Sequence, residues 1–276
     1  CTGCRYCMPC PRGVDIPGTF AAYNRSAYDG RFRGMKDYIM CAGLRKETAE
    51  ASKCVGCGKC TEVCPNGART LMGKYLTVDE IMTVVLKDKA FYKRGGGGVT
   101  VSGGEAAMNP GLALPILRRC REAGIHTILD TSGYAPWENL EVLLPYVDLF
   151  FYDIKCIDRD LHIQGTGVSN DLILENAKKI LQAGGKLRVR VPLIPRFNDS
   201  EEEIIKIARF TYDELGLGPD DINILKYNKM AQSKYVRLDE EYKGETDVPP
   251  DDELEKHTED MRELARRQYI HSICPE

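Results

Sequence analysis

Two runs of closely spaced cysteines constrain this chain more than any other feature of its sequence. The first run extends from Cys1 to Cys10 and the second from Cys54 to Cys64, and together they hold eight of the 12 cysteines. The second run has the spacing C-x2-C-x2-C-x3-C followed by proline, which is typical of bacterial proteins with two iron–sulfur clusters. In such proteins the fourth cysteine of each run ligates the cluster of the other run. The spacing therefore predicts two [4Fe–4S] clusters with crossed ligands.

The crossed arrangement divides the eight cysteines into two sets. One cluster is assigned to Cys1, Cys4, Cys7 and Cys64, and the other to Cys54, Cys57, Cys60 and Cys10. The first run has only two residues before its fourth cysteine, one fewer than the reference spacing. Structural zinc and disulfides are the alternatives. Zinc sites usually pair two C-x2-C units, and a disulfide across so short a spacing strains its bond geometry.

Length and charge narrow the class of protein. The chain has 276 residues, enough for one large and one small domain. A net charge of −3 and a pI near 5.9 indicate no broad basic surface, so we expect no nucleic-acid partner. No apolar stretch is long enough to span a bilayer, so we expect no membrane association. Thiolate-ligated clusters favour the cytoplasm as a reducing compartment. Since residue 1 is cysteine, we expect the chain to begin inside a longer protein.

Residue patterns predict two domains of different kinds. Residues 1–70 read as a small α+β ferredoxin-like domain, with residues 11–53 inserted as short helices between the cysteine runs. Residues 71–276 alternate strand and helix signals, which predicts parallel βαβ units and a partial β/α barrel. The predicted strands are Gly98–Val101, His126–Asp130, Leu149–Ile154, Lys186–Pro192 and Asp221–Lys226, and the predicted helices start near 77, 109, 137, 170, 201 and 250. The helix at 77–93 has no strand before it, which predicts that the first strand is missing.

Polar residues follow each predicted strand, at the end where parallel α/β folds bind their ligands. The five strand ends carry Ser102–Glu105, Asp130–Gly133, Asp153–Lys155, Arg190–Pro195 and Lys226–Asn228. Any one of them is equally well explained as a helix cap or surface loop, but all five together favour a binding site.

The chemistry of these strand ends fits an amino-acid-shaped ligand. Gly103 and Gly104 permit close approach of the backbone to a small polar molecule. Either Glu105 or Asp130 could hold an ammonium group. Lys155 and Arg190 could hold a carboxylate.

From about Lys53 to the C-terminus, the chain resembles the glycyl-radical-enzyme activating enzymes of the radical S-adenosylmethionine superfamily. The motifs that carry the resemblance are Cys54–Pro65, Gly95–Glu105, Leu129–Tyr134, Tyr152–Lys155, Gly165–Asn170, Arg190–Ser200 and Tyr227–Tyr235. Residues 1–64 also resemble the iron–sulfur segment at the C-terminus of certain aldo-keto reductases, which raises the possibility of a fusion, a chimeric reading frame or an unusual insert.

The resemblance implies a specific radical reaction. A reduced [4Fe–4S] cluster, held by a C-x3-C-x2-C loop after the first barrel strand, gives one electron to the sulfonium of S-adenosylmethionine. The products are methionine and a 5′-deoxyadenosyl radical, which takes hydrogen from a glycine of a partner glycyl radical enzyme. The two ferredoxin-type clusters relay electrons from a flavodoxin or ferredoxin-type donor.

Ligand contacts carry over from the family onto matching positions of this chain. They are Gly103, Gly104, Glu105, Asp130, Ser132, Lys155, Arg190 and Asn228, the last where many members have histidine. Asp130, Thr131 and Asp153 are further implied as ligands of a monovalent cation.

One departure from the family sets the expected activity. The chain contains no C-x3-C-x2-C, so we assign no catalytic residue. We expect an N-terminally incomplete activase that is inactive alone. The third cluster would belong to the complete protein. The competing hypothesis is an iron–sulfur electron-transfer module with a degenerate barrel. Binding of S-adenosylmethionine distinguishes the two.

Overall fold

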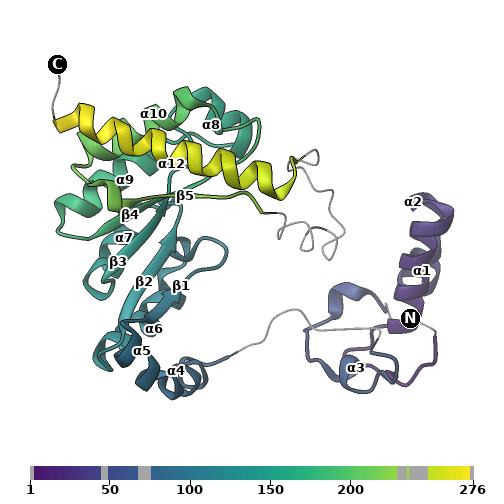
Figure 1. The fold of residues 1–276 in the computed structure, drawn as a ribbon. Helices are drawn as coiled ribbons and strands as arrows, with labels where there is room; N and C mark the ends of the chain where they lie inside the picture. The colour runs from purple at the N-terminus through teal and green to yellow at the C-terminus, as the bar shows by residue number, and fades with distance from the viewer. Residues whose placement is uncertain (1–2, 45–48, 68–75, 229–234, 236–247, 274–276) are drawn as a thin grey trace. The chain divides into compact units, whose positions relative to one another are not determined.

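A computed structural model describes residues 3–44, 49–67, 76–228, 235 and 248–273 (Figure 1). The chain divides into two compact units, Cys1–Leu76 and Thr77–Glu276. The domain boundary that we predicted at residue 70 lies outside the described residues.

The first unit is built around a helical hairpin between the two cysteine runs. Its helices are α1 (Ile16–Asp29), α2 (Arg31–Tyr38) and α3 (Lys59–Glu62), with a π-helical turn at Ile39–Gly43 and a 3-10 turn at Ala51–Lys53. Asp15 caps α1 by accepting a 3.0 Å hydrogen bond from the Gly18 amide. A Cβ atom at Gly34 would lie 2.4 Å from Ser26 Cβ, so glycine allows α1 and α2 to pack closely. The short helices predicted within residues 11–53 are thus confirmed.

The second unit is a parallel sheet whose strands follow one another in sequence order. The strands are β1 (Gly98–Val101), β2 (His126–Thr131), β3 (Leu149–Asp153), β4 (Leu187–Pro192) and β5 (Ile222–Leu225), and every neighbouring pair is parallel. The helices are α4 (Val78–Lys87), α5 (Lys89–Gly95), α6 (Pro110–Glu122), α7 (Trp137–Leu143), α8 (Arg159–Thr166), α9 (Asp171–Gln182), α10 (Glu201–Arg209) and α12 (Asp251–Ile273). Parallel strands in sequence order, each followed by a helix, are the arrangement predicted for a partial β/α barrel. In such an arrangement right-handed crossovers place successive helices on one face of the sheet.

Alternation along the strands separates the core from the polar face. Leu129, Phe150, Tyr152 and Val189 are completely buried and pack in one cluster with side chains of the covering helices. The residues between them point to the opposite face, because successive side chains of a strand alternate. Asp130, Asp153 and Arg190 belong to this second set, and all five strands end at the same edge of the sheet.

Some elements differ from the sequence prediction. The helix predicted at 77–93 is divided into α4 and α5 at Asp88. Helix α4 begins with a capping box, in which Thr77 Oγ1 accepts from the Glu80 amide at 3.2 Å and the Glu80 carboxylate accepts from the Thr77 amide at 2.7 Å. Helix α8 was missed because its weak apolar periodicity resembles a loop. Asp251 and Asp252, in an acidic stretch of the sequence, form the first turn of α12. Within the described residues, none of the helices has the length and apolarity that crossing a bilayer requires.

Candidate active site and cluster cavity

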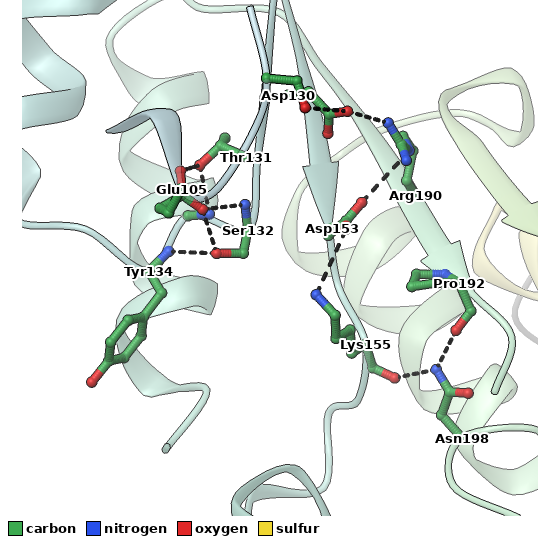
Figure 2. Close-up of polar contacts among 12 residues, drawn as sticks. Glu105, Asp130, Thr131, Ser132, Tyr134, Asp153, Lys155, Arg190, Pro192 and Asn198 are labelled. Atoms are coloured by element: carbon green, nitrogen blue, oxygen red, sulfur yellow. Dashed lines mark hydrogen bonds and ion pairs between the residues drawn. The ribbon is translucent and has the colours of Figure 1, made fainter. Parts of the chain in front are cut away.

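Glu105, in the loop after β1, is bound to the end of β2. Its Oε1 accepts hydrogen bonds from Thr131 Oγ1 at 2.5 Å and the Ala107 amide at 3.1 Å. Its Oε2 accepts from the Ser132 amide at 2.8 Å and from Ser132 Oγ at 2.6 Å (Figure 2). A carboxylate offers about four acceptor positions, and the chain already fills four. The Glu105 side chain therefore links the loop after β1 to the end of β2. Because its acceptor positions are filled, the ammonium group suggested for it from the sequence would have to bind to neighbouring residues.

A second set of charged side chains lies on the polar face of β2, β3 and β4. Arg190 Nη1 donates to Asp130 Oδ2 at 2.8 Å, and Arg190 Nε lies 3.5 Å from Asp153 Oδ1. Lys155 Nζ lies 3.6 Å from Asp153 Oδ2, so two cations and two carboxylates form a continuous row (Figure 2). Their side chains are 22–30% exposed, which leaves part of each accessible to a ligand.

Asp153 is the least satisfied member of this row. Burial raises the pKa of its carboxyl group above the usual value, and the charges of Lys155 and Arg190 lower it in part. Asp153 Oδ1 and Arg190 Nε are buried, and neither makes a hydrogen bond although they are within ion-pair distance of each other. Buried polar groups are normally hydrogen-bonded, so this pair retains capacity for a further partner.

The remaining predicted ligand contacts occupy less enclosed positions. Gly103 and Gly104 are exposed and adopt φ of +99° and +54°, and no atom lies within 4 Å of a Cβ built on either. Asn228 is exposed beyond the end of β5. Lys226, from the same strand end, instead pairs with Asp251 of α12 at 2.9 Å. The structure thus links the ends of β1 to β4 at the polar edge, whereas Lys226 is paired with α12.

The cysteine runs surround a cavity of about 550 Å³ in the first unit. Cys7 and Cys10 from the first run and Cys54, Cys57 and Cys60 from the second all contribute to its lining. Five thiols from both runs around one cavity suit crossed ligation of iron–sulfur clusters.

The other predicted cluster ligands in the described part of the chain do not line this cavity. Cys4 is exposed and Cys64 half-buried, and neither lines the cavity. Cys1 lies outside the described residues. No three His, Cys, Asp or Glu side chains in the described part of the chain are arranged to hold a single metal ion.

Two buried cysteines lie apart from these runs. Cys120 is fully buried beside Met82, with 3.8 Å between their sulfur atoms. Cys156 is 1% exposed, and burial raises the pKa of its thiol to about 12. Both are protonated at neutral pH and behave as packing residues.

Sequence reasoning missed a group of buried amide and carboxyl side chains behind the polar edge. Asn170, Asn198 and Glu203 are at most 2% exposed and hydrogen-bond to the loop after β3. Asn176 is also buried and donates to the carbonyls of Gly133 and Ala135 at 2.8 and 2.9 Å. In the sequence, the only sign that these residues hold the backbone of buried loops is that they are polar residues within otherwise apolar segments.

Comparison with known proteins agrees with this architecture. Residues 53–208 match the radical SAM superfamily, and residues 1–69 match a 4Fe–4S dicluster domain. The chain is 44% identical over 189 residues to an isethionate sulfite-lyase activating enzyme of Oleidesulfovibrio alaskensis, covering 67% of this chain and 60% of that protein. It is 36% identical over 245 residues to a choline trimethylamine-lyase activating enzyme of the same organism, covering 88% of this chain and 72% of that protein.

A solved structure agrees on the fold alone. Streptococcus suis SuiB bound to S-adenosylmethionine superposes with a TM-score of 0.51 at 18% identity, over 73% of this chain and 43% of that one. The parallel sheet, its polar edge and the cysteine-lined cavity therefore define an iron–sulfur protein with a radical SAM fold. The chain belongs to the glycyl-radical-enzyme activating enzymes of the radical SAM superfamily.

Proposed function

We propose that this chain is the S-adenosylmethionine-binding and electron-relaying part of a glycyl-radical-enzyme activating enzyme. In that reaction one electron splits the sulfonium into methionine and a 5′-deoxyadenosyl radical, which takes a hydrogen atom from a glycine of the partner enzyme. The observation that carries the proposal is the row of Asp130, Arg190, Asp153 and Lys155 at the carboxyl edge of the sheet. The chain spans 60% of the isethionate sulfite-lyase activating enzyme that it matches.

The polar edge would bind each part of S-adenosylmethionine with a different group. Lys155 and Arg190 would hold its carboxylate, since charge-assisted hydrogen bonds suit a half-buried site. The open backbone of Gly103 and Gly104 would accept from its amino group, with Glu105 fixing the loop. Asp130, Ser132 and Asn228 would contact the ribose side, where the proposal rests on the family motifs alone.

A monovalent cation is a further proposed occupant of the edge. Asp130, Thr131 and Asp153 supply the oxygens that such an ion prefers, and Asp153 Oδ1 is buried without a hydrogen bond. The Thr131 hydroxyl donates to Glu105 at 2.5 Å and accepts from the Gly133 amide at 2.9 Å, and its side chain alternates with that of Asp130, so the place of Thr131 in this site rests on the family motif alone.

Residues 1–70 would form the cluster domain and residues 71–276 the barrel domain. When bound, two [4Fe–4S] clusters would supply electrons, with one set of ligands at Cys1, Cys4, Cys7 and Cys64 and the other at Cys54, Cys57, Cys60 and Cys10. The five cysteines around the cavity support this assignment. We further propose a flavodoxin or ferredoxin-type donor, a glycyl radical enzyme as protein substrate, and the cytoplasm as location.

Calorimetric titration with S-adenosylmethionine tests the proposal on the anaerobically reconstituted chain. We expect one binding site, and a Lys155→Ala variant that binds roughly tenfold more weakly because it loses a charge-assisted contact. Lys87→Ala is the matched control, since Lys87 is exposed on α4. A wild-type chain that holds its clusters but shows no binding would favour the electron-transfer module instead. Because the sequence has no C-x3-C-x2-C, we expect binding without formation of 5′-deoxyadenosine.

A further inference from the structure

A fully buried asparagine joins the ends of β3 and β4. Asn198 Nδ2 donates to the carbonyl of Lys155 at 2.6 Å and to that of Pro192 at 2.9 Å (Figure 2). Asn198 Oδ1 accepts from the amide of Ile194 at 2.7 Å. The side chain is 0% exposed, so these bonds are shielded from water. One amide group therefore fixes three backbone positions on two neighbouring strand ends.

Two more buried side chains hold the rest of the loop after β3. Asn170 Nδ2 donates to the carbonyls of Cys156 and Ile157 at 2.9 and 2.8 Å. Glu203 Oε1 accepts from the amide of Ile157, and from that of Asp158 at 3.2 Å. Both side chains are 2% exposed.

These three side chains reach the loop from different elements. Asn170 precedes α9, Asn198 lies between β4 and α10, and Glu203 is in α10. Burying polar groups is costly unless each is hydrogen-bonded, and an apolar contact could cover the loop without this cost. What the polar contacts add is a defined backbone position for the loop.

These buried contacts fix the positions of Lys155 and Arg190, the two cations of the proposed site. Lys155 itself carries the carbonyl that Asn198 binds, and Arg190 lies two residues before Pro192 in β4. The side chains of Lys155 and Arg190 both approach Asp153, at 3.6 and 3.5 Å. A small shift of one strand end against the other would change the distance between the two cations.

We propose that Asn198, supported by Asn170 and Glu203, is a positioning residue that sets Lys155 against Arg190 so that both can hold the carboxylate of the ligand. The inference rests on the proposed function, which supplies the ligand. It adds that the fit to the carboxylate is fixed from behind the site, by residues that never touch the ligand.

The test compares S-adenosylmethionine with decarboxylated S-adenosylmethionine, which lacks the carboxylate, by calorimetric titration of the reconstituted chain. Wild type should prefer S-adenosylmethionine by about tenfold or more. Asn198→Ala should lose most of this preference, about a tenfold fall for S-adenosylmethionine with little change for the decarboxylated ligand. Thr211→Val is the matched control, because Thr211 is fully buried and donates to the carbonyl of Ile207 away from the site.

Each possible result either supports or overturns the positioning role of Asn198. If Asn198→Ala weakens both ligands equally, or neither, its role is only structural and the inference is overturned. If wild type binds both ligands equally, the carboxylate assignment of the proposed function fails first, and the inference with it. If Asn198→Ala does not fold, Asn170→Ala replaces it, since it releases the same loop at Cys156 and Ile157. A smaller loss of preference there supports the inference, and an unchanged preference contradicts it.

Discussion

Replacing Glu105 by glutamine should destabilise the second unit, although the two side chains have the same shape. Both carboxylate oxygens of Glu105 accept from a backbone amide, Oε1 from Ala107 and Oε2 from Ser132. Whichever way the new amide is turned, its NH₂ group therefore faces an N–H donor. The hydroxyls of Thr131 and Ser132 can rotate to accept, but a backbone N–H cannot.

The size of the effect follows from this single unsatisfied donor. Leaving a buried donor without a partner costs about 1–3 kcal/mol, and the charge assistance of the other bonds is lost as well. A loss of about 2 kcal/mol in a domain of this size lowers the melting temperature by about 4–8 °C. Calorimetry or urea unfolding of the second unit's transition measures the difference.

A surface glutamate provides the control. Glu141 is exposed, and Glu141→Gln should change stability by no more than about 0.5 kcal/mol. If Glu105→Gln is as stable as this control, the carboxylate of Glu105 does not hold the ends of β1 and β2 together, and the account of this loop is refuted.

Three further predictions concern the core, the charged row and the cluster cavity. Gly133→Ala should destabilise by more than about 2 kcal/mol in urea unfolding, because its Cβ would lie 1.7 Å from Tyr152 Oη at a φ of +73°; a smaller loss would mean that the ring moves aside. Arg190→Ala should raise the pKa of Asp153 further, since Arg190 lowers it in the wild type. A carboxyl group whose pKa is higher in the folded than in the unfolded protein lowers the free energy of unfolding as the pH rises from the unfolded pKa through the folded pKa. The variant should therefore lose more stability at pH 7.5 than at pH 4.5, and equal losses would contradict this. Cys57→Ala should lower the iron content of the reconstituted chain from about eight to about four atoms, and an unchanged content would exclude Cys57 as a ligand.

Local patterns predicted the elements and the edge at which polar residues gather. Strand β1 has the bounds expected from its short apolar run, β2 to β4 differ from the prediction by one residue at one end, and β5 is one residue shorter at each end. Period-two alternation and parallel topology depend only on neighbouring residues and chain order, so they are readable from the sequence. The same rules placed Asp130, Asp153 and Arg190 at one edge, where the structure has them.

Partners far apart in the sequence could not be predicted. Asn198 contacts Lys155 across 43 positions, and Glu105 contacts Ser132 across 27. No local pattern specifies such pairs, because they depend on how loops fold back over the strand ends. Lys226 shows the same limit, since only the position of α12 explains why it pairs with Asp251 rather than facing the proposed site.

A crystal structure of the anaerobically reconstituted chain with S-adenosylmethionine would show which residues hold each group of the ligand. We expect the carboxylate of the ligand to lie within hydrogen-bond distance of Lys155 or Arg190. We also expect the amino group of the ligand to lie against the backbone of Gly103 and Gly104. A ligand bound elsewhere on the chain, with the row of charges at the carboxyl edge unchanged, would show that this edge is not the binding site.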